Sequence, residues 1–263
     1  MRPLGALLWA AACHGLFQLV AYGLSVVRGG LDIVTLGSAQ ALVYLSCIVA
    51  MLRLFEPGVP LRQSLGLRPT DARLGAIGVG LGLCLKLPAE SLTRVVERHL
   101  PPDEGQLLAR AALYRTDTIA QVLALLVVLC LAAPLVEELF FRGASYGRLA
   151  KVGSRTAALT TGVTFVVVHS DLRHWPALFV VAAVLSTLRL AGGSLLPCLG
   201  LHVAFNATGV LALVTGAASV TRPLAVGVLP LLASWLLAAG LLLWLVRLSQ
   251  NPEALRARAA DRA

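Results

Sequence analysis

The chain has 263 residues, of which 58% are apolar and 13% are charged, and its mean hydropathy is +0.83. Soluble domains are about 45–50% apolar and about 25% charged, so this composition excludes a soluble globular protein and indicates an integral membrane protein. The net charge of +9 does not indicate nucleic-acid binding, because the basic residues lie in short loops and in the C-terminal tail, where membrane topology places them. We therefore expect the lipid bilayer as a partner and no nucleic acid.

Long apolar runs without period-two alternation predict spanning helices rather than barrel strands. At about 20 residues per span, the chain has room for about eight transmembrane helices and little else. We predict an all-α fold, a polytopic membrane helix bundle that forms one unit over residues 1–250, followed by a basic cytoplasmic tail over residues 251–263. The predicted spans are Leu4–Val27, Ile33–Leu54, Leu74–Ala89, Thr118–Phe141, Thr156–Ser170, Pro176–Leu190, Ser194–Gly216 and Pro223–Leu248.

Two of these spans depend on local sequence features. The first apolar run continues to Val27. It is longer than the apolar region of about 7–15 residues in a signal peptide, and we interpret it as a retained span. The third span is short and carries Lys86 and Glu90 near its end. Residues 91–117 then form the longest polar connection, which the proline pair at 101–102 is expected to split between two short interfacial helices.

The distribution of Lys and Arg predicts the orientation of the chain. An eight-span topology places 14 of these residues on the side of both termini and 7 on the other side, with Lys86 inside a span. The positive-inside rule then places both termini in the cytoplasm. We expect a multi-pass protein of the cell (inner) membrane.

Two adjacent carboxylates, Glu137 and Glu138, lie near the end of an apolar run that starts at Ile119. A carboxylate at the centre of a spanning helix costs about 2.5–3.5 kcal/mol on insertion scales, and a neighbouring like charge opposes its ionisation. Such residues mark function more often than structure, so we interpret the pair as the anchor of an active site. Glu138 and Arg142 are spaced i, i+4 and are expected to form an ion pair. Glu137 points about 100° away and is expected to remain free to act as a base.

Further polar side chains are predicted at a similar depth. If Ser154 caps the next helix after a turn, Glu137 and His169 each lie about 21–23 Å from that turn, on adjacent antiparallel helices. His202 and Asn206 are spaced i, i+4 and project from one face of a later helix.

These side chains indicate hydrolysis of an amide bond within the membrane. A glutamate beside a histidine in a dry cavity forms a general base for water, and a second histidine with an asparagine supplies donors for a tetrahedral oxyanion. Glu137, His169 and His202 are also ordinary ligands of zinc, so a divalent metal such as zinc stays open as a cofactor. The chain has no HExxH motif, and the spacing of these residues alone does not make a third ligand at one site obvious.

The chain resembles the CAAX protease and bacteriocin-processing (CPBP, or Abi) family of intramembrane endopeptidases over about residues 118–210. The motifs that carry the resemblance are Glu137-Glu138-x-x-x-Arg142, Phe165-x-x-x-His169 and His202-x-x-x-Asn206. The roles that it implies are the catalytic base for Glu137, water activation for His169, an oxyanion site for His202 and Asn206, and support for Glu138 and Arg142. Family members are described both as metalloproteases and as glutamate-dependent proteases.

The resemblance implies an endopeptidase that acts on membrane-associated protein or peptide substrates. One alternative is a non-catalytic membrane scaffold or bacteriocin-immunity protein of the same fold. A small transporter that uses Glu137 and His169 as a proton relay is less favoured, because the sequence has no repeat symmetry and no pair of broken helices.

Overall fold

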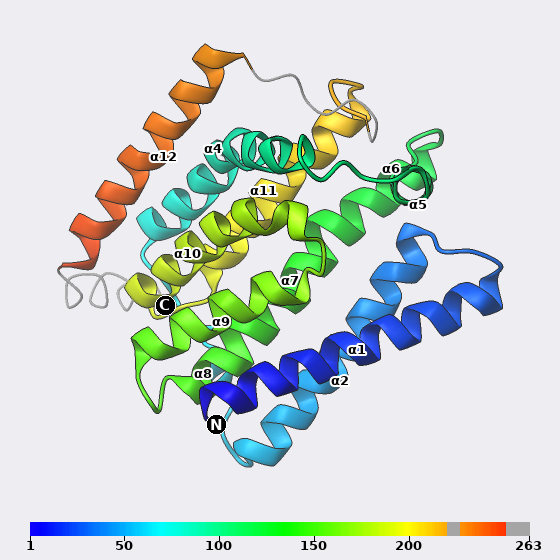
Figure 1. Cartoon of the computed structure of the whole chain (residues 1–263). Coiled ribbons are helices and arrows are strands. Elements are labelled where there is room, and N and C mark those ends of the chain that lie inside the picture. The colour runs from blue at the N-terminus through cyan, green and yellow to red at the C-terminus, as the bar shows by residue number, and fades with distance from the viewer. Residues whose placement is uncertain (220–226, 251–263) are drawn as a thin grey trace.

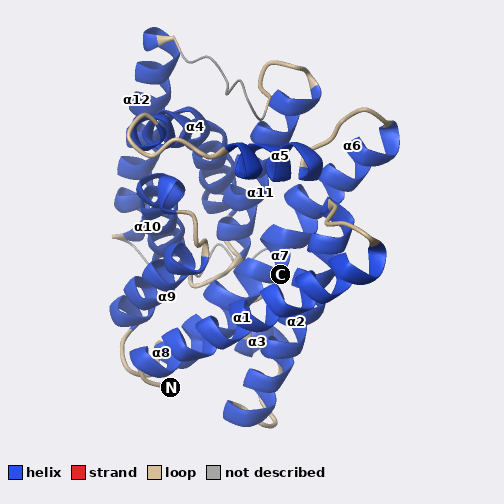
Figure 2. Ribbon diagram, turned by 45° about the vertical axis from the view of Figure 1, so that its right-hand side comes forward, coloured by secondary structure: helices blue, strands red, loops and turns tan. Residues whose placement is uncertain are grey.

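The structure is a computed structural model that describes residues 1–219 and 227–250. The described residues form helices joined by loops and contain no strand (Figure 2). The predicted all-α membrane bundle is confirmed, and the chain is a multi-pass membrane protein. The predicted tail over 251–263 and the predicted start of the last span at Pro223 lie outside the described residues.

Seven helices in the described ranges are long and apolar enough to cross a membrane. Six of them are regular or nearly so, and the seventh, Ile119–Leu149, is a composite. The six are α1 (Pro3–Arg28), α2 (Ile33–Phe55), α4 (Ala72–Glu97), α10 (Trp175–Gly192), α11 (Leu196–Val214) and α12 (Val228–Ser249). In Figure 1, α4, α10 and α11 occupy the middle of the bundle, α12 lies at one edge and the α1–α2 hairpin lies at the opposite side.

The composite helix carries the two adjacent glutamates. Two π-helical segments, η1 (Leu126–Ala132) and η2 (Leu139–Ser145), interrupt its α-helical turns. In a π turn the backbone N–H bonds to the carbonyl five residues earlier, which widens the helix, and such turns are frequent at functional sites. The α-helical pieces are α6 (Ile119–Leu125), α7 (Ala133–Glu138) and α8 (Tyr146–Leu149).

The predicted fifth span forms a helix that is short for a membrane crossing. α9 (Ser154–Val168) has 15 residues. It is therefore about 22 Å long, against a hydrocarbon core of about 30 Å. Two expectations are wrong here. Ser154 is the first helical residue rather than the cap, and Gly153 in the cap position has no side chain to offer. His169 lies just beyond the last helical residue rather than inside the helix.

α4 is longer than the predicted third span, because it continues for about two turns past Ala89. Pro88 lies inside the helix and does not end it. Lys86 Nζ and Glu90 Oε1 are 2.7 Å apart, so an i, i+4 ion pair supports the helix across the proline.

The polar connection after α4 holds one separate short helix rather than the expected two, because its first part belongs to α4. This helix, α5 (Glu104–Leu113), begins after the proline pair at 101–102. Asp103 caps it in a reciprocal capping box with Gln106. The remaining short elements are α3 (Leu61–Ser64) and η3 (Leu172–His174).

Close backbone contact between α4 and α11 places the second histidine motif. A Cβ atom on Gly78 would lie 2.3 Å from the carbonyl oxygen of Pro197, and one on Gly82 would lie 2.3 Å from that of Leu201. Only glycine permits this approach, and two small residues four apart are the usual means of close packing between membrane helices. This contact at Leu201 fixes the position of α11 relative to α4 at the residue directly before His202.

The α1–α2 hairpin packs against the composite helix through aromatic side chains. Asp32 caps α2 by accepting a hydrogen bond from the backbone N–H of Thr35 at 2.7 Å. The ring centroids of Phe17 and Tyr44 are 6.3 Å apart, and those of Tyr44 and Phe140 are 5.2 Å apart. The N-terminal hairpin therefore lies beside the helix turn that carries both glutamates.

Candidate active site

Glu138 is the most deeply buried residue of the predicted site. Its side chain is fully buried, and so is that of Arg142. Arg142 Nη1 donates to Glu138 Oε1 at 3.1 Å, the ion pair expected from the i, i+4 spacing. His202 Nδ1 lies 2.9 Å from the same carboxylate oxygen. Glu138 therefore joins the composite helix to α11.

Glu137 is also buried, with 8% of its surface exposed, but its surroundings differ. Gln40 on α2 donates its Nε2–H to Glu137 Oε1 at 2.7 Å. The other carboxylate oxygen, Oε2, lies 3.8 Å from His202 Nε2. Its position on the helix led us to expect that Glu137 would be free of partners. It is not free, because side chains of α2 and α11 both reach it. The sequence contained one signal for Gln40, an amide side chain inside an apolar span.

His202 lies between the two carboxylates, and its neighbours determine its tautomer. An ionised carboxylate can only accept a hydrogen bond, so the contact with Glu138 assigns a proton to Nδ1. In the neutral imidazole, Nε2 then carries a lone pair and faces Glu137 across 3.8 Å. This gap is too long for a direct hydrogen bond.

Arg142 has more donors than partners. Its Nε and Nη2 atoms, like Glu138 Oε2, have no hydrogen-bond partner among the described residues. The guanidinium lies over the ring of Phe165 at 4.5 Å from the centroid, in a cation–π contact. Arg189 on α10 donates its Nε–H to the backbone carbonyl of Arg142 at 2.8 Å, which ties α10 to η2.

A further buried arginine lies toward the end of the composite helix. The side chain of Arg148 is 1% exposed, and its Nη2 lies 3.0 Å from Glu56 Oε2. The exposed Lys151 lies 3.1 Å from the other oxygen of Glu56. We define the buried arginine region as Arg142, Arg148 and Arg189 with Glu56 and Glu138.

His169 occupies the C-cap position of α9. Its Nδ1 lies 2.7 Å from the carbonyl oxygen of Phe165. Since a carbonyl only accepts, Nδ1 carries the proton, and the side chain satisfies one of the open carbonyls at the helix end. The Phe165 ring lies between two histidines, at 4.6 Å from His169 and 5.9 Å from His202. Within the described residues His169 makes no hydrogen bond or ion pair with Glu137.

Asn206 bonds to the backbone of the composite helix. Its Nδ2 donates to the carbonyl oxygen of Leu129 in η1 at 2.8 Å. In the π pattern of this segment, Ala133 N–H bonds to Val128, so the next donor would come from residue 134. That residue is Pro134, which has no N–H, and the Leu129 carbonyl is left for the asparagine amide. One N–H of Asn206 remains for another partner.

The loop after His169 is held by a group of charged side chains. Asp171 N–H donates to the carbonyl of His169. Asp171 Oδ2 lies 2.7 Å from Arg110 of α5, and Oδ1 lies 2.7 Å from Arg173 Nε. Arg110 also pairs with Glu97 at 3.3 Å. We name Glu97, Arg110, Asp171 and Arg173 the Asp171 cluster.

These contacts perturb the titration of Asp171. Burial raises the pKa of its carboxyl, but the hydrogen bonds from Arg173 outweigh burial and hold the pKa at about 2, below the ordinary value of 3.8. The cluster therefore keeps Asp171 ionised over the physiological range.

The side chains of the site do not fit a metal centre as they stand. No group of three His, Cys, Asp or Glu side chains in the described ranges is placed to hold an ion. His202 Nδ1 is engaged by Glu138, and Arg142 compensates the charge of Glu138. The possible zinc ligands Glu137, His169 and His202 stay a prediction, and no step below is assigned to a metal.

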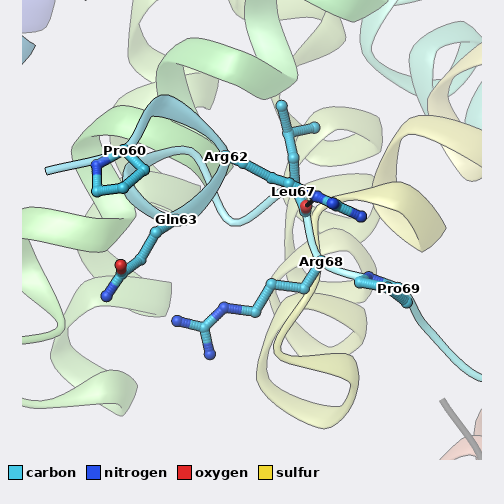
Figure 3. Close-up of a pocket in the computed structure, with 6 residues that line it drawn as sticks. All are labelled: Pro60, Arg62, Gln63, Leu67, Arg68 and Pro69. Atoms are coloured by element: carbon cyan, nitrogen blue, oxygen red, sulfur yellow. Dashed lines mark hydrogen bonds between the residues drawn. The ribbon is translucent and has the colours of Figure 1, made fainter. Parts of the chain in front are cut away.

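A shallow pocket lies apart from the glutamates, in the connection between α2 and α4. Its volume is about 350 Å³. Figure 3 shows the residues that line it. The side chains of Arg62 and Arg68 extend away from each other, and Arg62 Nε donates to the carbonyl of Leu67 at 3.0 Å. The arginines therefore do not converge on a common ligand. The lining residues are Pro60, Arg62, Gln63, Leu67, Arg68 and Pro69.

The fold and the site define a class of protein, a multi-pass membrane helix bundle with a buried glutamate–histidine centre. Residues 119–208 match a family described as type II CAAX prenyl endopeptidase, Rce1-like. The match bears out the predicted resemblance to the CAAX protease and bacteriocin-processing family over this segment of the chain. The resemblance indicates a hydrolase of the CAAX-protease type. No curated protein and no solved structure matches the chain.

Proposed function

We propose that the protein is an intramembrane endopeptidase that hydrolyses peptide bonds of membrane-associated protein or peptide substrates, with Glu137 as the base that activates water. The observation that carries this proposal is the contrast between two neighbouring glutamates. Glu138 is compensated by a buried arginine, whereas the polar contacts of Glu137 within the described residues are with an amide and an imidazole nitrogen. A buried carboxylate without a cation beside it is suited to accept a proton.

The gap between Glu137 and His202 is suited to one water molecule. Glu137 Oε2 and His202 Nε2 are 3.8 Å apart and are both acceptors in the neutral form of the histidine. A water at about 2.8 Å from each atom would donate one hydrogen to Glu137 Oε2 and the other to His202 Nε2, and would present a lone pair to a carbonyl carbon. Glu137 would take one proton as the C–O bond forms and return it to the amide nitrogen as the C–N bond breaks.

The remaining residues of the predicted site are proposed to act around this centre. The free N–H of Asn206 would donate to the oxyanion that develops on the carbonyl oxygen. His202 Nε2 would help to hold the water, and it would donate to the oxyanion only once protonated. His169 would provide a further acceptor for the water or the leaving amine on the other side of Phe165. The Glu138–Arg142 pair would orient His202.

A comparison of membrane peptides tests the proposal. Cells that carry Glu137→Gln should accumulate uncleaved or longer peptides relative to wild type at matched expression. Glu90→Gln is the matched control, because it changes a carboxylate of α4 that pairs with Lys86 outside this centre. Identical peptide profiles for wild type and Glu137→Gln, with the biological phenotype retained, would contradict the proposal and favour the scaffold or immunity protein.

The orientation is part of the proposal. We expect insertion in the cell (inner) membrane with both termini in the cytoplasm, supported by the 14 to 7 distribution of basic residues. Reporter fusions at the two termini should both give a cytoplasmic signal. An extracytoplasmic signal at one terminus would contradict the eight-crossing topology.

A further inference from the structure

We propose that Gln40 of α2 is a positioning residue that holds the Glu137 carboxylate in the orientation needed for base catalysis. The inference rests on the proposed function and deepens it. Gln40 lies outside residues 119–208, the segment that carries the family resemblance. Its side chain donates to Glu137 Oε1 at 2.7 Å, within the normal range of an N–H···O hydrogen bond.

One face of α2 fixes Gln40 against the composite helix. Gly37, Gln40 and Tyr44 are spaced i, i+3, i+7 and lie on that face. A Cβ atom on Gly37 would lie 2.5 Å from Val128 Cγ1, so the helices are in close contact one turn before Gln40. Tyr44 packs edge-on against Phe140 one turn after it. Gln40 is thus held from both sides, and the approach of its amide to Glu137 is set by the backbone.

The hydrogen bond separates the two oxygens of Glu137. Oε1 accepts from Gln40, and Oε2 is left facing His202 Nε2 at 3.8 Å. Without the amide, Oε1 would lose its donor on α2, and the carboxylate would be free to rotate out of the orientation that leaves Oε2 facing the proposed water. Because the amide is neutral, it orients the carboxylate without compensating its charge. Arg142, in contrast, compensates the charge of Glu138. Gln40 thus differs from a structural ion-pair partner.

The test is the kinetics of Gln40→Met in the purified full-length protein, with a peptide whose cleavage by wild type has been measured. Methionine keeps the length of the side chain and removes the N–H donor. We expect kcat to fall by about 10–100-fold, the effect of losing one hydrogen bond to a charged group, while KM stays within about twofold. Gln18→Met is the matched control, because Gln18 is also a glutamine of a spanning helix, α1, and bonds to His14 instead of Glu137. We expect it to retain the wild-type kcat.

A second variant keeps the inference testable if Gln40→Met does not fold. Gln40→Asn preserves the polarity of the position but shortens the side chain by one methylene, so its amide cannot reach Glu137. We expect the same loss of kcat. A kcat within twofold of wild type in either folded variant would overturn the inference, and so would a loss confined to KM.

The outcome for Glu137 is read separately. Glu137→Gln is measured on the same peptide. If it cleaves like wild type, the proposed function fails whatever the Gln40 variants do. If Glu137→Gln is inactive and Gln40→Met is fully active, the inference about Gln40 fails while the proposed function stands.

Discussion

The buried arginine region and the Asp171 cluster hold their charges in different ways. In the buried arginine region, the side chains of Glu138 and Arg142 are at most 1% exposed. In the Asp171 cluster, the side chains of Arg110 and Asp171 are 24% and 29% exposed. The first region holds Glu138 of the motif, and the second holds the loop that follows His169.

This difference in side-chain exposure determines how much stability each region loses when one partner of an ion pair is removed. Taking a charge out of water is costly, so a buried pair is stable only while both partners are present. A partly exposed pair exchanges protein contacts for water when it breaks and contributes little. We therefore expect changes in the buried arginine region to affect folding and changes in the Asp171 cluster to have small effects that depend on solution conditions.

The largest effect is expected for Arg142→Ala. It leaves Glu138 charged, fully buried and without its cation, which should destabilise the protein by about 3–5 kcal/mol. Reversible unfolding in detergent micelles measures this loss. The double variant Arg142→Met/Glu138→Gln removes both charges and should recover much of the stability. A loss below about 1 kcal/mol for the single variant would contradict the comparison.

An intermediate effect is expected at Glu56, where one carboxylate meets two cations of different exposure. The side chain of Arg148 is 1% exposed and that of Lys151 is 65% exposed. Arg148→Met should cost several times more stability than Lys151→Met, for which about 0–1 kcal/mol is expected. Thermal unfolding of the two variants side by side checks this. Equal losses would show that burial does not determine the strength of these pairs.

The smallest effect is expected for Asp171→Asn, at most about 1 kcal/mol and less at high salt. The pKa of Asp171 in the folded protein, about 2, lies below its ordinary value of 3.8. The ionised group therefore stabilises the fold above about pH 4, and this stabilisation is lost as the pH falls toward 2. Unfolding measured against pH should show wild type and variant converging over that window. A constant difference would contradict the assignment.

The sequence predicted the contacts that depend on helix periodicity. Glu138 and Arg142 meet because residues four apart share a face. All eight predicted spans correspond to helices, since long apolar runs have few alternatives in a membrane. The predicted resemblance to the family is borne out by the match over residues 119–208. The catalytic roles of Glu137, His169, His202 and Asn206 stay predictions.

Other features of the site depend on contacts between distant segments or on local deviations from α-helix. Gln40 reaches Glu137 only because α2 packs closely on η1, and the sequence of either helix alone does not predict this packing. The bond from Asn206 to Leu129 follows from a π pattern that leaves a carbonyl opposite Pro134 without a donor. The sequence did not predict the end of α9 at Val168, because residues 169–170 contain no glycine or proline that would mark the end of a helix.

The length of α9 has a consequence for the surrounding lipid. A helix of about 22 Å beside hydrocarbon about 30 Å thick creates a hydrophobic mismatch, which a bilayer relieves by thinning locally or by letting polar groups snorkel. The lipid next to α9 would therefore be compressed, and headgroups and water would lie closer to His169 than they would beside a helix that spans the full hydrocarbon thickness. Membranes of shorter acyl chains relieve this strain, so acyl-chain length becomes a variable that sets how readily this side of the protein is hydrated.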